Sequence, residues 1–543
     1  MTIIRFWILS FAAGKYRHRQ ISSQTNIIFI LLLVLLLPSG LKAQSNNQMS
    51  MFKMMHLFDW IGNYYVDTLN MDKLGDKIIR QTLRELDPHS VYITKDEVRA
   101  MNEPLEGSFD GIGVSFNILN DTILIISAIQ GGPSEKVGIM DGDKIITING
   151  VNVAGIGIND NGVRSRLRGP KGTEVSVGIR RRGYPELLQF RIVRDKIPLY
   201  SIDAAYKVTD GIGYIKLSRF AASSKREFDS TMLKLQKEGV FHLILDLTGN
   251  GGGYLETAAE LATNFLERGR LIVYTKGEHT PRRDYSVRSN GKFMISRLVL
   301  MIDERSASAS EILAGAIQDW DRGTIVGRRS FGKGLVQRQL VFPDSSMMRL
   351  TVARYYTPTG RAIQKPYNTK NDEYATGIIG NRLRTGELTG ETSATGADSL
   401  KYLTLNRRRT VYGGGGITPD IFVALDTSYY TPYYRKLFGL GIFNRFVLNY
   451  VDQNRQQLKR QYPTFEQFDQ RFVVTEAMMN ELQNFAEKEG LIRNPEMFAK
   501  SESNLRLWLK GNIARDLWDT SEMYQVVNWG DPIFLKALEE IQK

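Results

Sequence analysis

The sequence predicts a multidomain protein of mixed α+β structure, with a strand-rich module and an α/β domain between two helical ends. Residues 106–195 contain short β-rich runs separated by Gly-rich turns, which is typical of a small strand-dominated domain. Residues 196–424 alternate strand-like runs with helical stretches, as expected for helices packed on a sheet. Residues 44–105 and 425–543 have the apolar spacing of helices.

Within the α/β segment, buried strands are predicted for the runs GIGYIKL, HLILDL, RLVLMID and TIVG. Helices are predicted for Phe228–Glu238, Leu255–Glu267 and Ser308–Asp319. Residues 368–412 are polar and rich in Gly, Thr and Asn, which predicts a long loop or a surface insertion.

The first 43 residues have the order of a secretory signal. A basic stretch precedes the apolar run Ile27–Leu37 and the small-residue sequence SGLKAQS, which predicts cleavage after Ala43. The apolar run is shorter than the roughly 20 residues that span a bilayer, although an uncleaved signal anchor is the alternative. The chain has no cysteine, which excludes a lipid-modified cysteine anchor, disulfides and a cysteine nucleophile. An exported protein of this size without disulfides points to a bacterial envelope.

The formal net charge is +13, of which five units belong to the basic residues of the targeting segment. The remaining positive charge is spread along the chain, so it gives little support for nucleic-acid binding.

Three segments have residue types suited to catalysis. In Arg305–Trp320, a strand leads through small residues into a helix, so a serine hydroxyl there lies beside unpaired backbone amides that suit a developing oxyanion. Helix capping without catalysis is the alternative for these serines.

In Thr324–Gln337, Lys333 lies between two glycines after a strand. The run from Gly327 to Lys333 nearly matches a phosphate-binding loop, but Gly334 occupies the position of the required hydroxyl residue, which disfavours nucleotide binding. An exposed lysine without a function is the simplest alternative.

In His242–Ala262, a buried strand leads into a Gly-rich loop and a helix. Such a loop can cradle a phosphate, form one wall of an oxyanion hole, or be a tight turn without a ligand. Tyr254 breaks the dinucleotide-binding glycine pattern.

Other hydrolase chemistries have less support. The chain has five histidines, no G-x-S-x-G pattern for a Ser-His-Asp triad, and no H-E-x-x-H pattern for a metallopeptidase. The sequence therefore predicts neither a metal nor another cofactor.

Together, and in this order, the segments resemble those of the C-terminal processing peptidases, also called tail-specific proteases. The resemblance covers most of residues 72–424. It rests on the runs ELDPHSVYI, FDGIGVSF, GGPSEKVGIMDGDKIITINGV, LDLTGNGGGYL, SASASEI, GRRSFGKGLVQ, YYTPTGRAIQ and GGITPD. It implies an α/β, crotonase/ClpP-like peptidase core at 196–424, with a PDZ domain inserted at 106–195.

The resemblance implies a Ser–Lys dyad with Ser308 as nucleophile and Lys333 as general base, 25 residues apart. Gln337 is similar to the glutamine that positions the lysine. The implied oxyanion donors are the amides of Ala309 and of one glycine in Gly251–Gly253, for which Gly252 is our choice.

The chemistry of this dyad requires an uncharged amine. An exposed lysine has a pKa near 10.4, and burial among apolar neighbours such as Phe331, Leu335 and Val336 lowers it. One departure from the family is Thr248, where relatives often have Arg.

The implied PDZ domain binds a peptide as an added strand and holds its terminal carboxylate on backbone amides. The carboxylate-binding loop is predicted at Gly111, Ile112, Gly113 and Val114. A β module with a packing role alone is the alternative.

The sequence thus predicts a periplasmic serine endopeptidase that cuts exported proteins near apolar C-termini. A catalytically silent, PDZ-bearing scaffold or ligand-binding relative is the alternative, and the presence of Ser308, Lys333 and Gln337 argues against it. The predicted partners are protein or peptide C-termini and not nucleic acid. Membrane association, a homo-oligomer and an adaptor stay open.

Overall fold

The computed structural model describes residues 42–367, 376–392 and 400–543, and the chain divides into two compact units after residue 78. Nearly all of the predicted signal segment, and parts of the predicted polar insertion, lie outside the described residues. The first unit contains α3 (Lys42–Tyr64) and the start of α4 (Met71–Arg84). Many of its apolar side chains are exposed, among them Met51, Met55 and Trp60. None of the helices in the described ranges has the length and apolar composition needed to span a bilayer.

The strand-rich module of the second unit is built on a sheet with the order β3-β4-β5-β7-β8, in which β6 also pairs with β5. Alternate residues of its strands, such as Ile123, Ile125 and Ile145, form a compact aliphatic core. Strands β2 and β9 pair with each other at the two ends of the module. Its elements are β2 (Ser108–Gly111), β3 (Val114–Leu119), β4 (Thr122–Ala128), α6 (Pro133–Lys136), β5 (Lys144–Ile148), β6 (Val151–Asn152), α7 (Asp160–Leu167), β7 (Glu174–Arg180), β8 (Leu188–Val193) and β9 (Asp195–Pro198).

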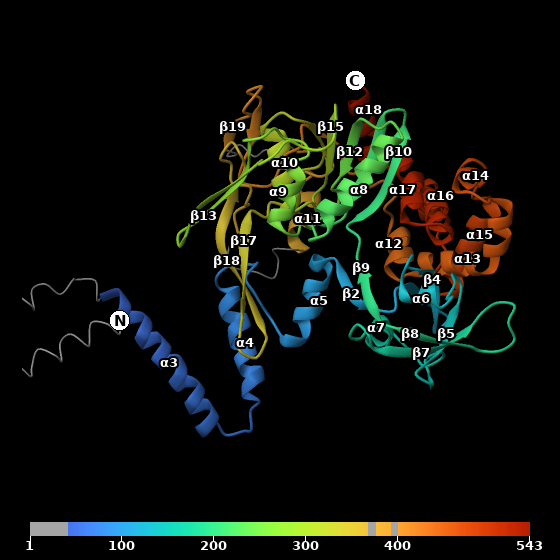
Figure 1. Cartoon of the computed structure of the whole chain (residues 1–543), viewed down its shortest axis with the longest axis horizontal. Coiled ribbons are helices and arrows are strands. Elements are labelled where there is room, and N and C mark those ends of the chain that lie inside the picture. Colours follow the sequence, from blue (N-terminus) through green and yellow to red (C-terminus); the bar gives the residue numbers. More distant parts are fainter. Residues whose placement is uncertain (1–41, 368–375, 393–399) are drawn as a thin grey trace, which may run out of the picture. The chain divides into compact units, whose positions relative to one another are not determined.

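The α/β domain is built on a sheet with the order β10-β11-β12-β15-β16-β21 (Figure 1). From β11 to β21 the neighbouring strands are parallel, so the loops after these strands meet at one edge. Helices α8, α9 and α10 pack with one face of the sheet. The elements are β10 (Ile202–Thr209), β11 (Ile212–Leu217), α8 (Ser224–Lys237), β12 (His242–Asp246), α9 (Leu255–Ala262), β15 (Leu298–Ile302), α10 (Ala309–Asp319), β16 (Thr324–Gly327) and β21 (Ile421–Phe422).

The opposite face of this sheet is covered by the C-terminal helix. Ile244 on β12 belongs to a cluster with Phe534 and Ile541, whereas its neighbours Leu243 and Leu245 face the other core. The C-terminal residues therefore complete the α/β domain. The sequence pattern predicted the helices but not this packing.

A second sheet, with the order β1-β18-β13-β14 and β17 paired with β18, carries the segment that follows Lys333. The segment 79–106 adds the short strand β1 and helix α5 (Lys95–Glu106), which begins after Thr94. The strands are β1 (Val91–Ile93), β13 (Leu271–Gly277), β14 (Thr280–Ser286), β17 (Leu335–Val341) and β18 (Met347–Tyr356).

The C-terminal helical region has its own aromatic and aliphatic core, which includes Phe443, Phe468 and Leu509. It also contacts the strand-rich module, where Lys144 pairs with Asp452 at 2.9 Å. The helices are α12 (Pro432–Gly439), α13 (Ile442–Gln461), α14 (Phe465–Arg471), α15 (Glu476–Lys488), α16 (Pro495–Leu517), α17 (Thr520–Val527), η3 (Asn528–Gly530) and α18 (Pro532–Gln542).

Three segments differ from the sequence prediction. Helix α8 begins at Ser224, before the predicted Phe228. The predicted loop 368–412 contains α11 (Thr376–Arg384) and a hairpin of β19 (Lys401–Leu403) and β20 (Thr410–Tyr412). The buried Arg382 ties this helix to Glu387 at 2.7 Å, a tertiary contact that composition does not reveal. Helix α9 ends at Ala262, before the predicted Glu267, because the chain there tightens into turns such as Phe265 N–H to Ala262 O.

Candidate active site

Ser308 lies in the turn between β15 and α10, immediately before the helix. Its φ of 57° is unusual for a residue other than glycine, which marks a strained and tightly held turn. The hydroxyls of the two neighbouring serines are bound inside the protein, since Ser306 donates to Leu247 O at 2.8 Å and Ser310 donates to Asn250 O at 2.9 Å. The Ser308 hydroxyl donates to no acceptor within the described ranges. Among the three serines, Ser308 is therefore the one whose hydroxyl is available.

Lys333 lies just before β17, and Gln337 lies on that strand. The Lys333 amine donates to Gln337 Oε1 at 3.4 Å, and the Gln337 amide donates to the backbone oxygen of His89. No hydrogen bond joins the Lys333 amine and the Ser308 hydroxyl among the residues that the structure describes. The structure thus brings Lys333 and Gln337 into contact, whereas the Lys333 amine and the Ser308 hydroxyl are not hydrogen-bonded to each other.

Burial lowers the pKa of Lys333, and the positive charge of Arg349 lowers it further. The carboxylates of Glu311 and Asp87 act in the opposite direction without cancelling the shift. The pKa of His89 is lowered to about 4, first by burial and then by the charge of Lys333. An imidazole with such a pKa is neutral at pH 7.

Glu311, three residues after Ser308, connects the two candidate catalytic segments. One of its oxygens accepts the amide N–H of Ser308 at 2.8 Å and that of Lys333 at 2.9 Å. The other accepts the Ser330 hydroxyl at 2.5 Å and the Gly332 amide at 2.7 Å. The side chain is fully buried, and burial raises its pKa although all four hydrogen bonds favour the ionised form.

Sequence reasoning assigned no role to Glu311. The pattern Ser308-x-x-Glu311 is that of a helix capping box, a signal that could have identified its contact with the Ser308 amide. The contacts with Lys333 depend on the tertiary fold.

The Gly-rich loop after β12 packs against the Ser308 turn. Gly252 has a φ of +101°, and a side chain there would meet Ser308 Cβ at 2.8 Å and Ala309 N at 3.0 Å. The loop is fastened by Asn250, whose backbone oxygen accepts the Ala307 amide at 2.9 Å. Close approach thus explains the glycine at position 252.

The two predicted oxyanion donors differ in whether their amides already have an acceptor. The Ala309 amide, at the first position of α10, donates to no acceptor within the described ranges. The Gly252 amide donates to the side-chain oxygen of Asn250 at 2.9 Å. Before it can bind an oxyanion, the Gly252 amide must therefore be released from Asn250.

Tyr355 is a further residue of the site to which sequence reasoning gave no role. Its hydroxyl lies within hydrogen-bond distance of the backbone oxygens of Ser308, at 3.1 Å, and of Lys333. The ring is buried, and burial raises the pKa of the phenol well above its usual value. The neutral Tyr355 hydroxyl thus links the same two segments as Glu311.

The predicted carboxylate-binding loop precedes β3, an edge strand of its sheet. Ser134 fixes the loop by donating its amide and hydroxyl to Ile112 O at 3.0 and 2.7 Å. Within the described ranges, the amides of Ile112 and Gly113 donate to no acceptor. Gly111 closes β2 and Val114 opens β3, so the four residues form one continuous loop beside an edge strand.

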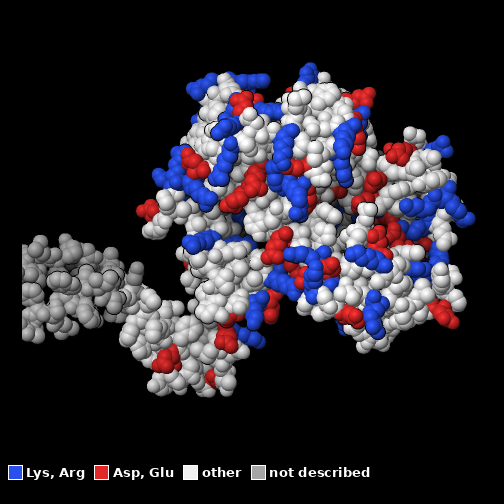
Figure 2. Space-filling model, in the orientation of Figure 1, with Lys and Arg blue, Asp and Glu red and all other residues white. Residues whose placement is uncertain are grey.

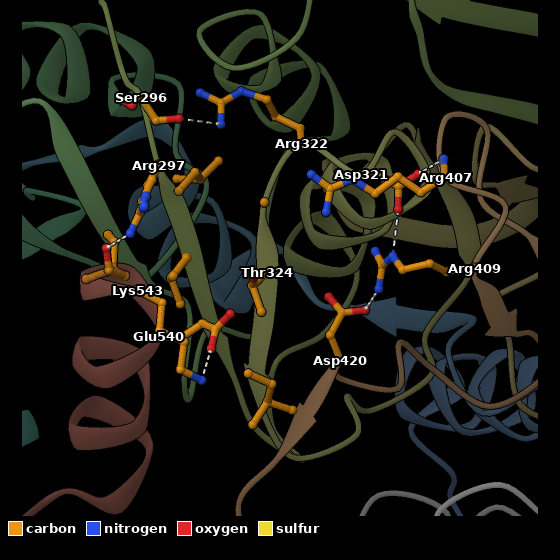
Figure 3. Close-up of a pocket in the computed structure, with 15 residues that line it drawn as sticks. Ser296, Arg297, Asp321, Arg322, Thr324, Arg407, Arg409, Asp420, Glu540 and Lys543 are labelled. Carbon is orange, nitrogen blue, oxygen red and sulfur yellow. Dashed lines mark hydrogen bonds and ion pairs between the residues drawn. The ribbon is translucent and has the colours of Figure 1, made fainter.

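A separate cavity of about 480 Å³ lies where β15 and β16 begin, at the opposite end of these strands from Ser308. Figure 3 shows Arg409 between Asp321 and Asp420, with which it forms ion pairs of 2.7 and 2.6 Å. These two ion pairs offset the positive charge of Arg409. The cavity contains none of the predicted catalytic residues.

Comparison with known proteins identifies the domains of the chain. A model of peptidase family S41 matches residues 211–374, a PDZ-domain model matches residues 100–180, and a family of unknown function (DUF8443) matches residues 433–519. The carboxy-terminal processing protease CtpB of Bacillus subtilis is 34% identical over 332 residues, which are 60% of this chain and 68% of the relative. A probable CtpA-like serine protease of Staphylococcus aureus (strain N315) is 32% identical over 327 residues, 60% of this chain and 64% of that relative.

Among solved structures, the photosystem II D1 C-terminal processing protease is 26% identical, with a TM-score of 0.34. The match covers 66% of this chain and 84% of that one. The chain spans about two thirds of the length of the two curated relatives.

The fold and the curated relatives together define the class: a serine peptidase core with a PDZ domain. The chain belongs to peptidase family S41, among the carboxy-terminal processing proteases.

Proposed function

We propose that this chain is an exported, periplasmic serine endopeptidase that binds protein C-termini through its PDZ domain and cleaves through a Ser308–Lys333 dyad. The observation that carries the proposal is the single Glu311 oxygen that accepts the backbone amides of both residues. This shared contact holds two chain segments, 25 residues apart in sequence, at one carboxylate. Such an arrangement suits two groups that must exchange a proton.

In the proposed reaction, the neutral Lys333 amine takes the proton of the Ser308 hydroxyl as its oxygen attacks the scissile carbonyl carbon. The negative charge that forms on the carbonyl oxygen is bound by the Ala309 amide and by one glycine amide of the Gly251–Gly253 loop, Gly252 by our assignment. Collapse of the intermediate breaks the peptide C–N bond, and the lysine returns its proton to the leaving amine. Water activated by the same amine then hydrolyses the acyl-enzyme.

The present arrangement precedes catalysis in this proposal, because the Lys333 amine contacts Gln337 instead of Ser308. Gln337 holds the amine near its working position until a rotation of the lysine side chain brings it to the hydroxyl. This rotation exchanges one hydrogen bond of 3.4 Å for another.

Tail recognition is proposed for the loop from Gly111 to Val114. Two unengaged amides at Ile112 and Gly113 suit a carboxylate, and the edge position of β3 in its sheet suits an added peptide strand. Figure 2 shows Lys and Arg interspersed with Asp and Glu over the visible face, so recognition through a large surface of one charge has no support there. Protein or peptide C-termini are the proposed partners.

Export is proposed from the targeting pattern of residues 1–43. For an exported protein, the lack of cysteine and hence of disulfides points to a bacterial envelope. The curated relatives named above are bacterial proteases, in keeping with a bacterial envelope.

The proposal is tested by the hydrolysis of casein and of peptides with apolar C-termini. Ser308→Ala and Lys333→Ala should each abolish cleavage, whereas Ser310→Ala, the matched serine control two residues away, should retain most of it. Equal activity in the wild type and both dyad variants would refute the dyad. No cleavage by any form, together with tight binding of peptide C-termini, would favour a silent scaffold.

A second experiment tests the PDZ assignment. A labelled peptide with an apolar C-terminus should bind the Ser308→Ala protein, and amidation of its carboxylate should weaken binding at least about tenfold, because charge-assisted hydrogen bonds are lost. Equal binding of the acid and the amide would contradict a carboxylate-binding loop.

A further inference from the structure

Lys216 is a buried charge for which the proposed reaction gives no role. It lies on β11, whose residues are all buried, and the residue is 6% exposed. An ammonium in the middle of a sheet is costly unless each of its donors has a partner. Because the desolvation cost is large, we expect every donor of this side chain to have an acceptor.

All three donors of this ammonium have acceptors at the start of the glycine loop. The amine donates to the backbone oxygen of Thr248 at 2.5 Å and to the hydroxyl of the same residue at 2.7 Å. It also pairs with Asp246 at 3.0 Å. The lysine therefore holds both the backbone oxygen and the side-chain hydroxyl of Thr248.

The Asp246 carboxylate also binds the Thr248 amide and Tyr214. One oxygen of Asp246 accepts the Thr248 amide at 2.7 Å, and the other accepts the buried Tyr214 hydroxyl at 2.6 Å. The amide, oxygen and hydroxyl of Thr248 are thus all fixed.

A short series of hydrogen bonds links Thr248 to the turn that contains Ser308. The next amide, that of Gly249, donates to Asp303 at 2.8 Å. The Asn250 backbone oxygen then accepts the Ala307 amide at 2.9 Å, one residue before Ser308. A shift of the first peptide group would therefore change where the loop amides point.

The C-terminal helices form the outer wall of this arrangement. The Tyr524 ring of α17 lies 5.9 Å from the Lys216 amine, a distance at which a cation and a ring attract. A cavity of about 570 Å³ separates the two regions, lined by Lys216 and Thr248 on one side and by Tyr524, Asn528 and Asp531 on the other.

We infer that Lys216 is a positioning residue for peptide hydrolysis, which holds the glycine loop through Thr248 so that its amides can bind the oxyanion. The inference rests on the proposed function, since it assigns the loop to the oxyanion. Loss of this contact should lower kcat more than it changes KM, because oxyanion binding acts in the transition state.

The experiment uses the full chain and a fluorogenic peptide. Lys216→Met should lower kcat at least tenfold with KM within threefold, and Lys216→Arg should recover most of the rate because it keeps the charge and the donors. Lys225→Met, which removes a half-buried ion pair with Asp229 on α8, is the control and should keep the wild-type kcat.

A matched pair at Thr248 keeps the inference testable if Lys216→Met does not fold. Thr248→Val removes the hydroxyl at nearly constant volume and should lower kcat severalfold, whereas Thr248→Ser keeps the hydroxyl and should stay within twofold of the wild type. Equal kcat for Thr248→Val, Thr248→Ser and the wild type would overturn the inference. So would a Lys216→Met enzyme that folds and has wild-type kcat.

A measurement without turnover separates this inference from the proposed function. Amide hydrogen exchange of residues 248–254 should be faster in Lys216→Met than in the wild type, with exchange in α13 unchanged. If Ser308→Ala cleaves as fast as the wild type, the proposed function fails; unchanged exchange in the loop defeats the Lys216 inference.

Discussion

Replacing Glu311 by Gln tests the shared anchor of the proposed dyad. The carboxylate receives two donors on each oxygen: the amides of Ser308 and Lys333 on one, and the Ser330 hydroxyl and Gly332 amide on the other. A carboxamide has one oxygen, and its NH₂ group would face two donors whichever way it turns. Two buried groups therefore lose their acceptor.

The magnitude follows from those two groups. A buried donor without a partner costs about 1–3 kcal/mol, which gives about 2–6 kcal/mol for the pair. The neutral side chain is easier to bury than the carboxylate, whose pKa burial raises, so we expect a net loss of about 2–4 kcal/mol in the free energy of unfolding. Because both dyad segments lose an anchor, kcat should fall about 100-fold, as for other displacements near 1 Å.

Urea unfolding followed by fluorescence, and peptide hydrolysis under native conditions, measure the two effects. Glu304→Gln is the matched control, since Glu304 is also buried but pairs with Arg328 at 2.7 Å and contacts neither dyad residue. It should lose stability and keep kcat within about threefold, a margin below 1 kcal/mol. The reasoning is refuted if Glu311→Gln keeps a comparable kcat, or if its loss of rate is no larger than that of the control.

Three further predictions concern the surroundings of the dyad. Arg349→Met should move the acid limb of the pH–rate profile to higher pH, because removing the positive charge raises the pKa of Lys333 and leaves less neutral amine at a given pH. Gly252→Ala should lower kcat about 100-fold, because its new Cβ would lie 2.8 Å from that of Ser308. Reversing Lys144 to Asp should cost about 1 kcal/mol of stability, and the compensating Asp452→Lys change should recover it.

Each of these has an internal control. Arg354→Met, an exposed change on the same strand as Arg349, should leave the acid limb in place. Gly249→Ala tests strain alone, since Gly249 also has a positive φ but open space at its Cβ, and it should lose much less rate than Gly252→Ala. A charge-swapped pair that melts no higher than its single variants would refute the ion pair between the PDZ domain and α13.

The sequence predicted those features that local pattern determines. Strand–loop–helix junctions placed Ser308 before a helix and the Gly-rich loop after a strand, and both were confirmed. Alternating β-rich runs predicted the strand-rich module, because period-two patterning and Gly-rich turns are local properties. The roles of individual side chains at these junctions are still predictions.

Contacts across long sequence separations were not predictable in this way. Gln337 donates to the backbone of His89, which is 248 positions away, and α18 packs on the central sheet from the other end of the chain. Neither contact leaves a local pattern. Glu311 is an intermediate case, since its capping contact has a sequence signal whereas its contact with Lys333 depends on the fold.

The central claim is that an uncharged amine at position 333 removes the proton of Ser308. Because the chain has no cysteine, Lys333→Cys introduces a single thiol that can be alkylated selectively. We predict that this variant is inactive, that 2-bromoethylamine restores hydrolysis by rebuilding a lysine-like amine, and that the acid limb moves to lower pH because the sulfur makes this amine less basic. Iodoacetamide, which adds no amine, should restore nothing. Activity in the unmodified variant, or a restored enzyme with the wild-type acid limb, would contradict the lysine as base.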